Sequence, residues 1–164
     1  MFMLFCPPPL EFIAKSFEGN TPVFAQALDG VTDEEMRRAP SDHNSSMLWL
    51  AGHLVRGRGR TLITLGLAAD PWDMFGRGTH LDPNVKYPTR QEILQRWAEY
   101  SGQLHHALRG LKDGDIKKQA QVPNPPSLDG TIGGQVAFLA FHEAYHMGQL
   151  GYLRKWLGHS ALAG

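Results

Sequence analysis

The sequence contains a single cysteine, Cys6, among its 164 residues. One thiol cannot form an internal disulfide or a multi-cysteine zinc site, so neither contributes to the stability of this protein. The charges show no excess of either sign, because Lys+Arg and Asp+Glu both number 16. A protein that binds nucleic acid through the phosphates usually carries a basic excess. We therefore expect no nucleic-acid partner.

Long hydrophobic runs are also missing. The sequence nowhere reaches the roughly 18 consecutive apolar residues of a membrane-spanning helix. The apolar stretch from Met1 to Cys6 has no basic residue before it and is shorter than the apolar region of a secretory signal. We therefore expect no membrane partner and a cytoplasmic location.

Four long stretches carry apolar residues at helical spacing, approximately residues 10–28, 44–66, 89–111 and 131–157. Pro22 predicts a kink or a restart within the first stretch. Loops of residues 67–88 and around residues 122–126 separate the later stretches. The expected fold class is all-α, a four-helix bundle with two long connecting loops. The length fits one domain, residues 1–164.

Histidines provide the strongest functional signal. His142 and His146 are four residues apart, so both lie on one face of the last expected helix. Their neighbours on that stripe are large and apolar, apart from two glutamines, which predicts that the stripe faces the core. A single buried histidine is usually satisfied by a hydrogen-bond partner. Two adjacent imidazoles are costly to desolvate together, and a divalent cation relieves that cost by accepting both lone pairs.

A third ligand has to come from another helix, and His53 is the best candidate. It lies in the second stretch, at the border of an apolar sector, and Gly52 and Gly57 near it permit the close approach of a neighbour. Three protein ligands leave one position for water or substrate, which is typical of catalytic metal sites. The other five histidines are expected at the surface, and they are His43, His80, His105, His106 and His159.

A zinc-peptidase motif overlaps these residues. His142-Glu143-Ala-Tyr-His146 matches H-E-x-x-H, in which Glu143 would act as the general base. No acidic residue follows His146 to serve as a third ligand, and no strand is expected beside the helix. The peptidase hypothesis is therefore the weaker one.

The chain resembles the DinB/YfiT-like superfamily over nearly its whole length. The resemblance rests on Trp-x-x-x-His-Leu from Trp49 to Leu54 and on His-x-x-x-His-x-Gly-Gln from His142 to Gln149. It implies a four-helix bundle, a divalent metal held by His53 and the two later histidines, and often a homodimer. Some members of this superfamily are metal-dependent thiol transferases or thiol-dependent isomerases.

A site of three neutral imidazoles leaves the full charge on the cation, which would activate a coordinated thiol or water. We therefore expect a metal-dependent thiol transferase, or with lower priority a hydrolase, that acts on a small molecule. Glu143 and Gln149 are candidate catalytic or supporting residues. Zinc and nickel are the first candidates for the metal, and iron and copper also suit three nitrogen ligands.

Arginines extend the candidate site along the second stretch. Arg56 and Arg60 lie on the same side as His53, where they suit the carboxylate of a substrate or of an anionic thiol. The alternative is a solvated helix face or a salt bridge in a dimer. Trp72 in the first long loop is a further candidate for substrate contact. The competing hypothesis for the whole protein is a metal-stabilised dimeric bundle without catalytic activity.

Overall fold

The structure is a computed structural model that describes residues 8–121 and 126–162, so Cys6 lies outside the described residues. The described part contains no strand and only one isolated bridge, between Gln119 and Thr131. This confirms the expected all-α class. The elements are α1 (Pro8–Leu28), α2 (Asp33–Arg37), α3 (Met47–Thr64), the short 3-10 helix η1 (Asp73–Phe75), α4 (Arg90–Gly110), α5 (Asp113–Ile116) and α6 (Ile132–Trp156).

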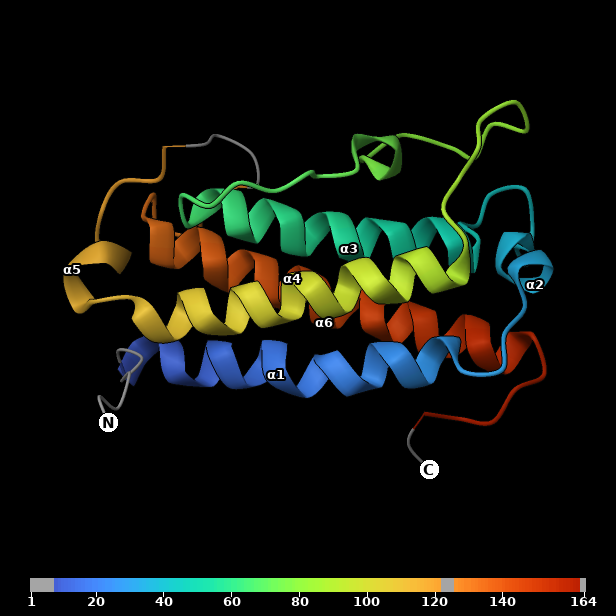
Figure 1. Ribbon diagram of the computed structural model, residues 1–164, viewed down its shortest axis with the longest axis horizontal. Helices are drawn as coiled ribbons and strands as arrows, with labels where there is room; N and C mark the ends of the chain where they lie inside the picture. The colour runs from blue at the N-terminus through green and yellow to red at the C-terminus, as the bar shows by residue number, and fades with distance from the viewer. Residues whose placement is uncertain (1–7, 122–125, 163–164) are drawn as a thin grey trace.

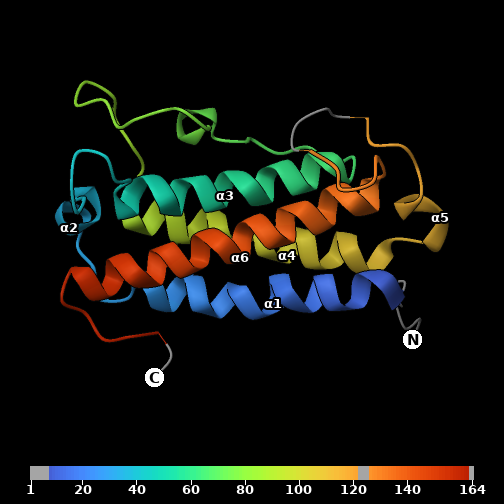
Figure 2. The same cartoon turned by 180° about the vertical axis from the view of Figure 1, so that it is seen from behind.

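α1, α3, α4 and α6 form the bundle (Figure 1). α3 packs against α4 and α6, and α1 packs against the same two helices on the other side. α1 and α6 run in one direction and α3 and α4 in the other, as both views show (Figures 1 and 2). The connection from α3 to α4 therefore has to return along the whole bundle, which explains why it is so long.

Polar caps begin four of the helices, α2, α3, α4 and α6. Thr32 and Thr89 accept a hydrogen bond from the backbone N–H three residues later, and the glutamate at that position bonds back to the cap. Ser46 and Thr131 cap α3 and α6 through their hydroxyl groups. Gly158 follows α6 with a φ of 94°, a left-handed conformation that ends the helix.

The expected restart of the first helix at Pro22 is wrong. α1 continues from Pro8 through Pro22 to Leu28 without interruption. Proline removes the donor for one helical hydrogen bond, but its fixed φ is compatible with the helix. The buried side chains of Phe17 and Phe24 on either side hold the segment against the bundle, and this packing outweighs the missing bond. The short α5 is an element that the sequence did not predict.

Aromatic packing fills the centre of the bundle. Phe24 of α1 stacks on Trp97 of α4 with ring centroids 4.0 Å apart, and both side chains are buried. Trp97 Nε1 donates to the backbone oxygen of Thr21, which satisfies its polar end.

In the described part of the chain, no helix is both long and apolar enough to cross a membrane.

The long connection lies along the outer side of α3 (Figure 1). Its residue Phe75, in η1, is fully buried against α3. Tyr100 donates a hydrogen bond of 2.6 Å to the backbone oxygen of Asp70, and Trp49 Nε1 donates one of 3.0 Å to the Thr79 hydroxyl. These contacts fasten the connection to the bundle and make it one wall of the pocket described next.

Candidate metal centre

Three histidines meet where α3 and α6 pack together. The Nε2 atom of His142 lies 3.1 Å from the Nε2 of His53 and 3.1 Å from that of His146. The ligand atoms of all three residues lie within 4.8 Å of one another. His53 is buried, and the other two rings are partly exposed. The sequence prediction that these three residues come together is therefore confirmed.

Hydrogen bonds at the outer ring nitrogens fix the orientation of two rings. Nδ1 of His53 lies 2.6 Å from the backbone oxygen of Phe75, and Nδ1 of His146 lies 2.6 Å from Oε1 of Gln149. Both oxygens accept hydrogen bonds, so each Nδ1 carries the proton and each Nε2 presents a lone pair to the centre of the cluster.

Burial keeps the rings neutral. It lowers the pKa of His53 to about 4, although the hydrogen bond with the Phe75 carbonyl raises it in part, and the neighbouring His146 and Arg56 lower it further. It also lowers the pKa of His142 to about 4, and the pKa of His146 is lowered by burial as well. At neutral pH the three imidazoles are therefore unprotonated and able to donate lone pairs.

The spacing fits a divalent cation. Tetrahedral coordination with metal–nitrogen bonds of about 2.0–2.1 Å separates ligand nitrogens by roughly 3.3 Å. The two measured separations of 3.1 Å are close to this value. Lone pairs directed at one point repel each other unless a positive charge lies between them. The donor set is thus compatible with a metal held by His53, His142 and His146.

The backbone at Gly52 determines how close the connection can approach His53. A Cβ atom at Gly52 would lie 2.5 Å from three atoms of the Phe75 ring, so only glycine permits the observed packing. The same approach brings the Phe75 carbonyl to His53 Nδ1. Gly57 is less constrained, since a Cβ there would lie 4.0 Å from His142 Nδ1. The sequence prediction of a close approach therefore holds at Gly52.

We expect Gly52→Ala to weaken metal binding. The new methyl group has to displace Phe75, which moves its carbonyl away from His53, and loss of such an outer hydrogen bond typically costs about 10–100-fold in affinity. Competition with a chromogenic chelator measures this change. Gly102→Ala is the matched control, because a Cβ there has no neighbour within 4 Å. Equal metal affinity in Gly52→Ala and the wild type would contradict the role of this packing.

Glu143 lies in the core and not with the histidines. Its two carboxylate oxygens accept hydrogen bonds of 2.9 Å from Nε and Nη2 of Arg58, and Asn20 donates to it at 3.2 Å. Both charged side chains are almost fully buried. Since Arg58 occupies both oxygens, Glu143 is not placed to act as the general base that the H-E-x-x-H pattern suggested.

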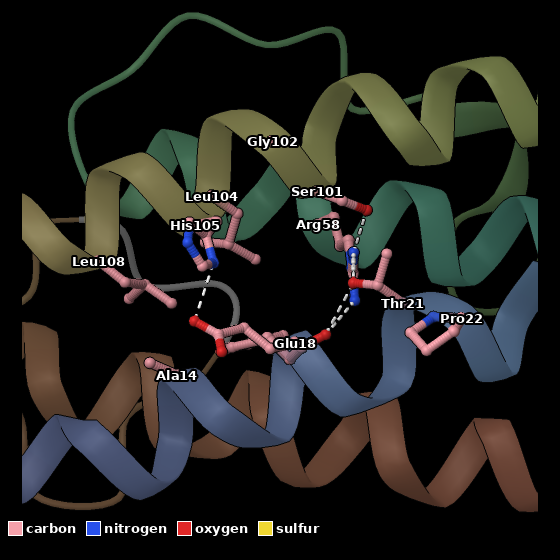
Figure 3. A pocket seen from close by; sticks show the side chains of 11 residues that line it. Ala14, Glu18, Thr21, Pro22, Arg58, Ser101, Gly102, Leu104, His105 and Leu108 are labelled. Carbon is pink, nitrogen blue, oxygen red and sulfur yellow. Dashed lines mark hydrogen bonds and ion pairs between the residues drawn. The ribbon is translucent and has the colours of Figure 1, made fainter.

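Arg58 connects all four helices of the bundle. From α3 it contacts Glu143 of α6, the backbone oxygen of Phe17 and the Thr21 hydroxyl of α1, and the Ser101 hydroxyl of α4. Figure 3 shows its side chain between Thr21 and Ser101, at the bottom of a groove of about 390 Å³ between α1 and α4. Its guanidinium also lies 3.4 Å from the centroid of the Trp97 ring, a cation–π contact.

Sequence reasoning missed Arg58, although a signal was present. Arg58 is four residues from both Leu54 and Leu62, which are buried, so it lies within the apolar sector of α3. A basic residue in such a sector predicts a buried partner of opposite charge. Glu143, at the border of the predicted stripe, was the available carboxylate.

The buried face of α6 differs from the predicted one. The predicted stripe placed both histidines towards the core, but His142 and His146 lie at its edge, where they are partly exposed. Trp156, another large apolar residue on the predicted stripe, is exposed as well. The face is rotated because Glu143 turns inward to meet Arg58. The residues of α6 that are buried are Gly134, Gln135, Val136, Leu139, Ala140, Glu143, Met147, Leu150, Leu153 and Arg154.

A pocket of about 940 Å³ opens beside the three histidines. Arg56 and Arg60 line it, as the sequence predicted for residues on the same side as His53. Trp72 is not among its lining residues, and its ring instead packs near Phe75 and under the guanidinium of Arg96. Gln149 contacts His146 and lines a second groove of about 630 Å³, which Trp49 and Leu50 of α3 also line.

The remaining histidines lie apart from the cluster. His43, His80 and His106 are exposed, as the sequence predicted. His105 and His159 are partly buried, and each contacts a glutamate, Glu18 at 2.8 Å and Glu35 at 3.3 Å. Within residues 8–121 and 126–162, the cluster of His53, His142 and His146 is the only group of three or more histidine, cysteine, aspartate or glutamate side chains that could hold a metal ion.

Solved structures share this fold, and two of them are the following. A conserved protein from Enterococcus faecalis matches with a TM-score of 0.68 at 15% identity, over 90% of this chain and 96% of that chain. A DinB-like protein from Bacillus subtilis matches with a TM-score of 0.64 at 14% identity, over 94% of this chain and 97% of that chain. No curated protein matches the sequence. The sequence model of the DinB superfamily matches residues 16–150, and since this is most of the chain, the protein belongs to the DinB superfamily.

Proposed function

We propose that this protein is a metal-dependent enzyme in which His53, His142 and His146 hold a divalent cation and a small thiol is the nucleophile. The observation that carries the proposal is the convergence of three neutral Nε2 atoms beside an open pocket. A divalent cation held there would lower the pKa of a coordinated thiol or water, so that either is deprotonated near neutral pH. Zinc and nickel are the metals that we would test first.

The chain itself has two tasks in this proposal. The Phe75 carbonyl and Gln149 keep His53 and His146 in the orientation that ligation requires. The pocket supplies the binding surface for the substrate, and its volume of about 940 Å³ is typical of a small-molecule site. The thiol is preferred over water because the resemblance of the sequence to this superfamily implies thiol transfer.

A thiol-transfer assay tests the proposal. 1-Chloro-2,4-dinitrobenzene serves as the electrophile, with cysteine, glutathione and 2-mercaptoethanol as the thiols. The thiolate sulfur attacks the ring carbon that carries chlorine, a C–S bond forms, the C–Cl bond breaks, and chloride leaves while the thiol proton passes to solvent. We expect a rate above the uncatalysed one that disappears with a chelator and returns with Zn²⁺ or Ni²⁺, followed by absorbance. p-Nitrophenyl acetate in the same assay tests hydrolysis.

The non-catalytic alternative predicts a different pattern. There, removal of the metal lowers the melting temperature, because a ligand that binds only the folded state stabilises it. No thiol or ester is turned over in that case, with or without metal. Stoichiometric metal together with an absence of any metal-dependent rate would replace the enzyme proposal with this alternative.

We also propose a cytoplasmic homodimer. Support for the dimer comes from α6, whose outer face exposes Phe141, Tyr145 and Tyr152, with exposed fractions of 67%, 57% and 65%. Aromatic side chains at this spacing form one continuous stripe on a helix, and such a surface is typical of protein contacts.

A further inference from the structure

The pocket beside the histidines carries an excess of positive charge. Three arginines line it, Arg56, Arg60 and Arg77, against a single carboxylate, that of Asp73. The three histidines do not add to this charge, since burial keeps them neutral. Low-dielectric walls around one sign of charge attract ligands of the opposite sign. The part of the pocket lined by these three arginines thus resembles a binding surface for an anion.

Asp73 does not neutralise its two arginine neighbours. Nη2 of Arg56 and Nη2 of Arg60 both contact the same oxygen, Oδ1 of Asp73, and each distance is 3.3 Å. Charge-assisted N–H···O bonds are typically about 2.7–2.9 Å long, and arginine usually engages a carboxylate through two parallel bonds. One carboxylate oxygen shared at long range therefore leaves both guanidinium groups with unused donors.

Arg56 has an unused donor that is also shielded from water. Its Nε is buried and has no hydrogen-bond partner among the residues that the structure describes. Burial, and then the charge of Arg60, lowers the pKa of Arg56, and Asp73 offsets this only in part. Buried polar groups usually have a partner, so the contact with Asp73 does not account for this donor.

The positions on α3 define how far an anion lies from the histidines. His53, Arg56 and Arg60 are at helical spacings of three and seven residues, so all three lie on one face. With a rise of about 1.5 Å per residue, the two arginine Cα atoms lie roughly 4.5 and 10.5 Å from that of His53 along the axis. A ligand that reaches both groups needs its anionic end about one to two helical turns from its reactive atom.

We infer that Arg56 and Arg60 form a subsite for the carboxylate of the small thiol substrate, next to the three histidines. That the ligand is a thiol rests on the proposed function. That it carries a carboxylate rests on the geometry of the arginines alone. Arg77 lies at the exposed rim of the same part of the pocket. Binding of the carboxylate orients the thiol end towards His53, His142 and His146.

A matched pair of thiols tests the subsite in the Co²⁺-loaded protein. 6-Mercaptohexanoate and 6-mercapto-1-hexanol have the same chain length and differ in the carboxylate, and thiolate-to-cobalt absorbance reports their binding. We expect the carboxylate thiol to bind about tenfold to hundredfold more tightly, the range of one or two hydrogen bonds to a charged group. A ratio near one in the wild type would overturn the inference.

Variants assign the preference to the arginines. In Arg56→Gln/Arg60→Gln the ratio of the two affinities should fall to about one. Arg109→Gln is the control, because Arg109 is an exposed arginine of α4 that pairs with Glu18, and it should keep the wild-type ratio. A preference that survives in the double variant would also overturn the inference.

Failure of the metal proposal can be recognised separately. If the protein takes up no Co²⁺, the proposed function is wrong, and the subsite is tested in the metal-free protein with hexanoate and hexanol. NMR of arginine Nε–H groups should then show a shift of the Arg56 resonance with hexanoate and none with hexanol. An Arg56 resonance that does not respond to hexanoate would overturn the subsite as well.

Discussion

Replacing Arg58 with methionine is expected to lower the free energy of unfolding by about 3–5 kcal/mol, the usual cost of leaving one charge of a buried ion pair without its partner. The reason is the position of Glu143, whose carboxylate is buried and receives two of its three hydrogen bonds from Arg58. Methionine has a similar length but no donor, so the buried carboxylate loses two of its three hydrogen bonds.

Urea unfolding of the metal-free protein measures this effect. Arg109→Met is the matched control, because its ion pair with Glu18 is exposed and such pairs contribute about 0–1 kcal/mol. The double variant Arg58→Met/Glu143→Leu should recover much of the loss, since apolar groups of similar volume often replace a buried pair without cost. An Arg58→Met variant within about 1 kcal/mol of the wild type would show that the pair does not hold the bundle together.

Removing any one of the three histidines is expected to abolish stoichiometric metal binding. His53→Ala, His142→Ala and His146→Ala each leave two nitrogens, and the penalty should exceed the roughly 10–100-fold that loss of an outer hydrogen bond costs. Elemental analysis after dialysis measures the metal content, and circular dichroism follows the helices. His142 and His146 lie at the edge of the buried face of α6, and His53 is a single buried side chain of α3, so the helical signal should not change.

The matched control for these variants is His105→Ala, which removes a partly exposed histidine of α4 that contacts Glu18. It should keep the full metal content. The metal content of Gln149→Leu should lie between that of the ligand variants and that of His105→Ala. This variant keeps all three ligands and removes only the acceptor at His146 Nδ1. Full metal content in all three ligand variants would refute the assignment of the centre.

The sequence was sufficient to predict the bundle and the histidine cluster. Four amphipathic stretches with capping residues such as Thr89 determine the helices locally, and the i, i+4 spacing of His142 and His146 puts them on one face. His53 could be added because it borders an apolar sector of another helix. These features depend on short-range periodicity, which a single sequence displays.

The rest depends on contacts between distant parts of the chain. Glu143 and Arg58 are 85 residues apart. The position of Arg58 in an apolar sector indicates a buried partner of opposite charge, but not which carboxylate supplies it. For the same reason, the hydrophobic pattern of α6 could not predict which of its faces is buried, or that His142 and His146 lie at the edge of that face. The burial of Phe75 against Gly52 depends on how the long loop folds back.

The segment between α3 and α4 has a consequence for how this scaffold can be diversified. It supplies Asp73 and Arg77 to the pocket, so new ligand preferences can be engineered there without touching the helical framework. The same segment supplies the Phe75 carbonyl that selects the tautomer of His53. A transplanted loop therefore has to reproduce one backbone oxygen whatever side chains it carries, or a change in selectivity will bring a loss of the metal with it.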